Sequence, residues 1–287
     1  MSFLNSPQWR AFQESAGRET FNIGEGYALK LGVQFGKNYL YSNFSEIPKY
    51  LKEIKKIAKK ENAIFFKWEP MMERQATSDK RQELEKLGFR KAQKELQPQK
   101  TVIIDIKKDD DEILSKMHKK TRYNIRLAEK RGVSVKESED KIKDIGIFWE
   151  LLQETAERDK FYTHPKEYYE KLIELDMAKL YFAHKSKQVH AVAIVIFYKK
   201  RATYLHGASS YEHRRDMAPY MLHFKIMQEA KTENLKEYDL WGIDEDKWPG
   251  MTRFKRGLGG REVEYIGSWD MPFNTFWYKA HVLKNRL

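Results

Sequence analysis

The stretch AKLYFAHKSKQVHAVAIVIFYKKRATYLH, residues 178–206, decides the fold class. Its apolar residues form three runs separated by short polar segments, which predict β-strands at 178–183, 189–197 and 202–206. A helix over about 216–232 and another strand over 238–243 follow. This order of strands, helix and strand predicts a mixed sheet flanked by helices, and therefore an α/β (α+β) fold.

The rest of the chain shows the same mixture of strands and helices on both sides of Gln97-Pro98-Gln99. A chain of 287 residues suits two domains of about 100–200 residues each, so we expect a domain boundary here. Before it we expect helices at 7–15, 49–60 and 78–86, and strands at 27–35, 39–41 and 63–68. After it we expect strands at 101–106 and 263–269, helices at 110–131, 140–157 and 273–287, and a helix opened by Thr163 and Pro165.

The composition indicates a folded, basic protein without cysteine. The chain has 54 Lys and Arg against 42 Asp and Glu, and the net charge of +12 favours nucleic acid, anionic lipid or a phosphorylated small molecule as partner. Without Cys there is no disulfide, thiol nucleophile or zinc–thiolate site, which fits a cytoplasmic location. The longest apolar run, 189–198, is too short to span a bilayer, and the first residues do not resemble a signal peptide.

Much of the positive charge lies between residues 116 and 136, which contain eight Lys and Arg and one acid, Glu129. On the expected helix 110–131, apolar and basic residues fall on opposite faces. Such a basic face is either simply solvated or a contact surface for phosphates, and the helical spacing favours phosphates. The candidate phosphate contacts, for an RNA rather than DNA, are Lys119, Arg122, Arg126 and Lys130.

The common catalytic motifs are absent from the sequence. There is no P-loop, GxGxxG, HExxH or GxSxG pattern, so the usual kinase, hydrolase and metalloenzyme chemistries are not indicated. His184, His190 and His206 lie on expected strands, where a lone histidine is more often structural than a ligand. We therefore expect no metal site.

Polar and aromatic residues gather at the ends of expected strands instead. Tyr204 and His206 lie on one strand, Asp239 and Asp244 flank the end of another, and Phe254-Lys255 follows in an expected turn. Ligands usually bind at strand ends in open α/β sheets, so these residues together indicate a cleft.

Several motifs, in order along most of the chain, resemble those of the Fem family (FemABX), the aminoacyltransferases that build peptidoglycan interpeptide bridges. They are KTRYNIRLA at 120–128 with Gly132-Val133, ETAERDKF at 154–161, YLHGAS at 204–209, RRDMAP at 214–219, YDLWGI at 238–243, and Phe254-Lys255.

The resemblance implies a fold of two tandem acetyltransferase-like (GNAT) domains. The first would comprise 1–98 joined by the C-terminal segment 270–287, and the second would comprise 99–269. It also implies a reaction, in which an aminoacyl group moves from aminoacyl-tRNA to the side-chain amine of the stem peptide of a peptidoglycan precursor. The long helical arm of some members is absent here and the first domain is short, so lipid-linked and nucleotide-linked precursors both stay open.

The resemblance also implies roles for individual residues. Lys255, preceded by Phe254, matches the lysine near the reacting carbonyl, and Glu69 lies where some members have a proposed acidic residue. The residues matched to substrate binding are Arg158, Tyr162, Tyr204, Trp9 and Lys37.

The implied chemistry is physically reasonable. Attack of an amine on an ester passes through an oxyanion, which a compact cation such as the Lys255 ammonium can stabilise. Asp239 and Glu69, or the tRNA ribose, are candidates to accept the proton of the amine. Because the tRNA ester is already activated, no cofactor is needed beyond aminoacyl-tRNA as co-substrate.

Other functions compete with this one. An acyl-CoA-dependent acyltransferase would need backbone N–H donors in the loop 214–219, but Met217 is bulky and Pro219 has no N–H. A non-catalytic RNA-binding module and a transferase with another acceptor remain as alternatives. The basic faces at 49–60 and 116–136 also permit peripheral contact of a cytoplasmic protein with the inner face of an anionic membrane.

Overall fold

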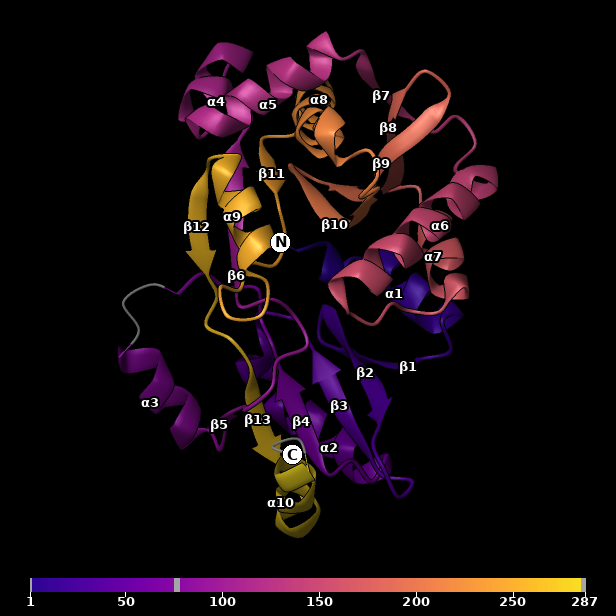
Figure 1. Cartoon of the computed structure of the whole chain (residues 1–287). Helices are drawn as coiled ribbons and strands as arrows, with labels where there is room; N and C mark the ends of the chain where they lie inside the picture. Colours follow the sequence, from indigo (N-terminus) through magenta and orange to yellow (C-terminus); the bar gives the residue numbers. More distant parts are fainter. Residues whose placement is uncertain (1, 75–77, 285–287) are drawn as a thin grey trace. The chain divides into compact units, whose positions relative to one another are not determined.

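The computed structural model describes residues 2–74 and 78–284, and its contacts divide the chain into two units (Figure 1). Unit 1 comprises 1–99 and 263–287, and unit 2 comprises 100–262. Each contains one mixed sheet flanked by helices, which confirms the expected fold class.

Unit 1 is built on a six-stranded sheet in the order β1-β2-β3-β4-β13-β5. Its strands are β1 (Glu19–Ile23), β2 (Gly26–Gly32), β3 (Asn38–Ser42), β4 (Phe65–Trp68), β5 (Arg90–Lys91) and β13 (Trp269–Pro272). Its helices are α1 (Pro7–Ser15), α2 (Leu51–Lys60), α3 (Ser78–Lys86) and α10 (Thr275–Lys284), with 3₁₀ turns at Phe3–Asn5 and Ile47–Tyr50.

The late strand β13 returns to unit 1 and lies between β4 and β5 (Figure 1, yellow between purple). It pairs antiparallel with both, Trp269 opposite Trp68 on one side and opposite Lys91 on the other. Residues 263–269, which the resemblance assigned to the second domain, group with unit 1 by their contacts, although Val263 and Glu264 belong to the edge strand β12 (Arg261–Glu264) of the other sheet.

The sheet of unit 1 is covered on both faces, so β4 is buried along its whole length. Phe66 lies in the apolar cluster with Ile54 and Ala58 of α2, and the next-door Phe65 lies in the cluster with Tyr278 of α10. Adjacent strand residues point to opposite faces, so all four residues of FFKW are buried, and the charge of Lys67 is paired with Asp270 at 2.8 Å.

Unit 2 is built on a seven-stranded sheet in the order β12-β6-β11-β10-β9-β8-β7. Its strands are β6 (Lys100–Asp105), β7 (Val133–Glu137), β8 (Ala178–Lys185), β9 (Gln188–Tyr198), β10 (Arg201–Ser209), β11 (Glu237–Asp239) and β12 (Arg261–Glu264). Its helices are α4 (Asp110–Lys116), α5 (Lys119–Lys130), α6 (Lys141–Asp159), α7 (Lys166–Ile173), α8 (Ala218–Thr232) and α9 (Pro249–Gly257), with a 3₁₀ turn at Arg214–Asp216. The three antiparallel strands expected from 178–206 are confirmed as β8, β9 and β10.

The expected single helix 110–131 is wrong, because the chain breaks into α4 and α5 at Met117 and His118. Both residues are extended, and the N–H of His118 donates to the carbonyl of Gly257 rather than to its own helix. The His118 side chain then accepts from the N–H of Lys120 and caps α5. The apolar periodicity continued across the break, so periodicity alone could not reveal it.

Three other expectations at the end of unit 2 are corrected. The strand expected at 238–243 ends at Asp239, because Trp241 and Gly242 adopt positive φ angles that no strand allows. Phe254 and Lys255 lie on α9, not in a turn. The strand expected at 263–269 is two strands, β12 and β13, in different sheets.

Substitution of Gly260 tests the close packing next to β6. Gly260 has φ +100°, and a Cβ there would lie 2.6 Å from the carbonyl oxygen of Ile103. We expect Gly260→Ala to lower the free energy of unfolding of unit 2 by about 2–4 kcal/mol in urea titrations. Gly250→Ala in α9 is the control, since its Cβ meets nothing within 4 Å, and equal losses in both variants would contradict the packing argument.

Candidate active site

Lys255 is a cation held inside unit 2. Its side chain lies on α9 and is only 5% exposed. The Nζ donates to the carbonyl of Trp241 and, at 2.8 Å, to the carbonyl of Gly242. Burial lowers the pKa of Lys255 to about 7, against the opposing attraction of Asp239. At neutral pH the amine is therefore close to the midpoint of its titration.

The two carbonyls face Lys255 because the chain turns sharply after β11. Trp241 has φ +51° and Gly242 φ +36°. The turn is anchored by Asp239, whose Oδ1 accepts from the Trp241 N–H at 2.9 Å and from the Thr101 hydroxyl at 2.6 Å. Its Oδ2 lies 3.4 Å from an Arg201 nitrogen. Asp239 thus links β6, β10 and the turn, and both of its carboxylate oxygens have partners.

A cluster of aromatic side chains, called the aromatic wall, lies beside Lys255. Its Nζ lies 5.6 Å from the ring centroid of Tyr204, which is in edge contact with His223 at 4.5 Å. Phe254 packs on His223 and on Tyr220, at centroid distances of 5.4 and 5.0 Å. The low dielectric of such a wall strengthens any charge interaction inside it.

The His223 side chain in the aromatic wall is uncharged and is held by a hydrogen bond. It is 1% exposed, and its Nδ1 lies 2.8 Å from the Tyr238 hydroxyl. Burial first, and the charge of Lys255 second, lower the pKa of His223 to about 3. Lys255 is therefore the cation of this wall. Sequence reasoning missed His223, because a histidine inside an apolar helix pattern carries no signal of its own.

The strand that carries Tyr204 is irregular at this point. The register of β9 and β10 shifts between Tyr204 and His206. A Cβ on Gly207 would lie 2.0 Å from the Tyr204 hydroxyl oxygen, so only glycine lets the ring take this position. Such bulges re-aim side chains next to sites.

Three predicted site residues belong to unit 1. Glu69 is buried and accepts from the Tyr41 hydroxyl and the Leu96 N–H, both at 2.8 Å. Burial raises the pKa of Glu69, while these hydrogen bonds oppose the rise. Trp9 is buried against Phe12, and the Nζ of Lys37 lies 5.1 Å from the Trp277 ring. Their predicted roles stay predictions.

Arg158 and Tyr162 flank the end of α6. Arg158 lies on its last turn rather than in the expected loop, pairs with Asp159 and donates to the Ser209 carbonyl at 2.9 Å. Tyr162 is fully exposed. Ser209 is the last residue of β10, so Arg158 lies at the C-terminal end of the strand that carries Tyr204.

Three of the four predicted phosphate contacts are exposed on α5 despite the helix break. Lys119, Arg126 and Lys130 are exposed on α5. Arg122 instead donates to the Met117 carbonyl, at the end of α4, so it stabilises the break. Tyr123 is 62% exposed on the same helix and offers an aromatic ring beside the cations.

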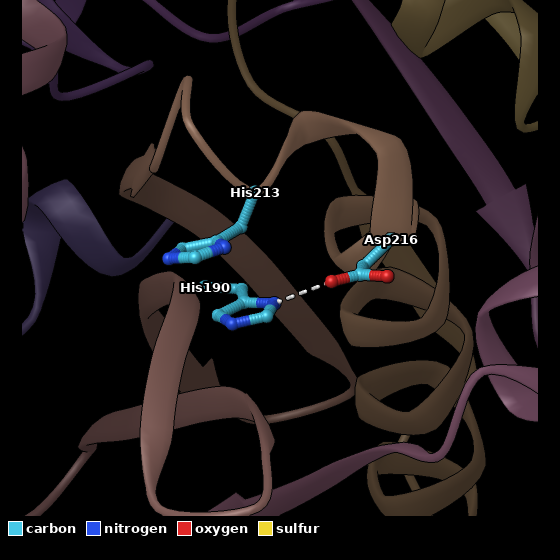
Figure 2. A group of neighbouring side chains, drawn as sticks. All are labelled: His190, His213 and Asp216. Atoms are coloured by element: carbon cyan, nitrogen blue, oxygen red, sulfur yellow. Dashed lines mark ion pairs between the residues drawn. The ribbon is translucent and has the colours of Figure 1, made fainter.

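A side-chain cluster that the sequence did not reveal lies before α8. Figure 2 shows the His190 ring stacked on that of His213, with Asp216 beside it. The Nδ1 of His190 lies 3.4 Å from Asp216 Oδ2, and Lys185 lies 3.1 Å from Oδ1. Two imidazoles and a carboxylate are donors that zinc accepts, but Asp216 already has a cationic partner. The contacts brace the turn that precedes Met217, which has φ +58°.

The comparisons with known proteins agree with this architecture. A FemAB family model matches residues 29–184 and 174–285. The chain is 27% identical to the Lipid II:glycine glycyltransferase of Staphylococcus aureus (strain USA300), over 83% of this chain and 76% of that protein. The corresponding protein of Staphylococcus haemolyticus is 25% identical over the same shares.

Solved structures show the same fold. The crystal structure of FemX aligns with a TM-score of 0.84 at 23% identity, over 97% of this chain and 94% of that one. The L-PGS structure from Bacillus licheniformis aligns with a TM-score of 0.63 at 12% identity, over 100% and 97%. In the part of the chain that the structure describes, no helix is long and apolar enough to span a bilayer. The predicted class of enzyme, a transferase, is confirmed, and the chain belongs to the FemAB family.

Proposed function

We propose that this protein is a tRNA-dependent aminoacyltransferase that adds an amino acid to the stem-peptide amine of the peptidoglycan precursor lipid II, for interpeptide bridge formation. The observation that carries the proposal is the buried Lys255 amine, which lies against the aromatic wall and donates to two backbone carbonyls. The names of the relatives, Lipid II:glycine glycyltransferase, support the lipid-linked acceptor over the nucleotide-linked one.

The reaction balances without a covalent enzyme intermediate. The amine of the stem peptide attacks the ester carbonyl that joins the amino acid to the tRNA ribose. A C–N bond forms, the ester C–O bond breaks, and the ribose oxygen leaves with the proton that the amine loses. The Lys255 ammonium stabilises the oxyanion of the tetrahedral intermediate, which in well-formed sites lowers the barrier by about 3–4 kcal/mol.

Asp239 acts as a positioning residue in this mechanism. Both of its oxygens are engaged by Thr101, Trp241 and Arg201, so the carboxylate holds the turn that aims Lys255. The oxygens of Glu69 are engaged in the same way. The ribose hydroxyl is then the proposed proton acceptor, and the reaction needs no cofactor besides the charged tRNA.

The exposed cations of α5 suit the tRNA. Lys119, Arg126 and Lys130 are exposed and can present their charge to phosphates, and Tyr123 adds a ring on which a base can stack. We propose that the protein acts at the cytoplasmic face of the membrane, because charged tRNA is cytoplasmic and lipid II is membrane-bound.

Acyl-CoA is a poorer donor for this site. Met217 takes the position before α8 with φ +58° and no capping hydrogen bond, and Pro219 lies in the first turn. A pyrophosphate there would lose the N–H donor that Pro219 lacks and would meet the bulky Met217 side chain.

The experiment that tests the proposal is transfer of labelled amino acids from bulk charged tRNA to lipid-linked and nucleotide-linked stem peptides. RNase-sensitive labelling of the lipid-linked acceptor supports it. Tight tRNA binding without labelling of either acceptor would instead support the RNA-binding module or another acceptor.

Replacement of Lys255 by Met tests the oxyanion role. We expect Lys255→Met to lower the rate of transfer about 10²–10³-fold, because one oxyanion donor is lost. Affinity for tRNA and acceptor should stay within about twofold. The thermal midpoint should change little, since the removal of a buried cation offsets the loss of the donor to the Trp241 and Gly242 carbonyls. A lower midpoint with a normal rate per folded molecule would mean that Lys255 is only structural.

Neutralising the α5 cations tests the tRNA surface. We expect the triple substitution Lys119→Ala, Arg126→Ala and Lys130→Ala to weaken tRNA binding and to reduce the slope of log Kd against log salt by about 2–3. The matched control is Lys52→Ala, Lys56→Ala and Lys59→Ala on α2, which removes the same charge from unit 1. An equal loss in both triples would show that only net charge matters.

A further inference from the structure

Unit 1 exposes a patch of large apolar side chains where the β2–β3 turn meets α10. Phe35 is 81% exposed, and Phe276 and Leu283 of α10 are 72% and 63% exposed. The Trp277 ring contacts the two phenylalanines, with its centroid 6.1 Å from that of Phe35 and 5.4 Å from that of Phe276. Phe276 and Leu283 are seven residues apart, so they share one helix face. These four residues are called the apolar patch below.

Phe35 has a backbone conformation that is unfavourable for a bulky residue. It has φ +59° and Gly36 has φ +65°, and the Lys37 N–H donates to the Gln34 carbonyl at 3.3 Å. This is a type I′ turn, whose first central position favours Asn, Asp or Gly. A bulky residue there is strained, and Phe35 remains largely exposed to solvent. Folding therefore does not explain its presence, and a contact with another molecule would.

The two segments that form the apolar patch carry charged side chains of one sign only. Neither 26–45 nor 271–287, the segments that form it, contains an Asp or Glu. Lys37 lies 5.1 Å from the Trp277 ring, and Lys279 is exposed on α10 between Phe276 and Leu283. An apolar surface with Trp and Lys at its rim has the composition of a membrane-interface contact.

We propose that the apolar patch docks unit 1 on an anionic lipid bilayer, with Phe35, Phe276 and Leu283 inserted among the headgroups and the lysines on lipid phosphates. The inference rests on the proposed function, since a lipid-linked acceptor must be reached at a bilayer surface. It names a surface different from the basic faces at 49–60 and 116–136. The face at 49–60 has no strongly exposed large apolar side chain, so it offers charge without insertion.

Phe35→Asn is a sharp test, because it has opposite effects on folding and on docking. Asn-Gly is the preferred pair for a type I′ turn, so the thermal midpoint should stay or rise. Binding to vesicles of phosphatidylglycerol and phosphatidylcholine should fall about tenfold in a sedimentation assay. Phe35→Asn with Phe276→Ser should lower binding about 30-fold or more. Ile142→Ser, which removes an exposed apolar residue of α6, is the control and should bind as the unaltered protein does.

Two further measurements complete the test. Lys279→Glu should weaken binding to the anionic vesicles about fivefold or more and leave the already weak binding to pure phosphatidylcholine unchanged. Transfer to a water-soluble stem peptide should be unchanged in Phe35→Asn/Phe276→Ser, while transfer to vesicle-embedded acceptor falls.

Clear outcomes would overturn the inference. Vesicle binding that survives Phe35→Asn/Phe276→Ser, or that falls equally in Ile142→Ser, rules out the apolar patch as the docking site. A dimer in gel filtration that the double substitution dissociates, without any loss of vesicle binding, would assign the patch to a second copy of the chain. Vesicle binding is measured without substrate, so its failure is separate from a failure of the proposed transfer reaction.

Discussion

The hydrogen bonds that the buried Asp239 carboxylate accepts determine the geometry of the candidate site. This carboxylate ends β11, between β6 and β10, and accepts from Thr101 and Trp241 while Arg201 lies beside it. Burial raises the pKa of Asp239, and these partners offset the cost of its charge. Because the Trp241 N–H is fixed, the chain turns and its next carbonyls point at Lys255. The position of the lysine therefore follows from a buried carboxylate rather than from a surface salt bridge.

The strands that apolar runs define could be predicted from the sequence. Residues 178–206 gave β8, β9 and β10, because buried strands produce long apolar runs bounded by polar turns. The helix break at Met117 could not be predicted, since a contact with Gly257, far along the chain, creates it. For the same reason α9 was missed: PGMTRFKRG has glycine at both ends and little apolar periodicity, and Thr252 and Lys255 are buried by tertiary contacts.

The candidate site was only partly predictable. The strand-end pattern and the family resemblance both pointed to Lys255 and Phe254, and the structure surrounds them with the wall of Tyr204 and His223. Neither spacing nor composition could show that Asp239 and Glu69 are already hydrogen-bonded, because their partners are distant in sequence. The apolar patch was invisible for a similar reason: the strain at Phe35 appears only once its φ angle is known.

The pH dependence of transfer to a water-soluble stem peptide tests the role of Lys255 most directly. The acceptor amine must be neutral to attack, so log kcat/KM gains about one unit per pH unit below its pKa of about 10.4. The ammonium of Lys255 is lost above about pH 7. We expect a slope of +1 below pH 7 and a plateau above it, after correction for ester hydrolysis. A slope of +1 that continues to pH 9 would contradict the oxyanion role, and a change from +2 to +1 would make Lys255 the base.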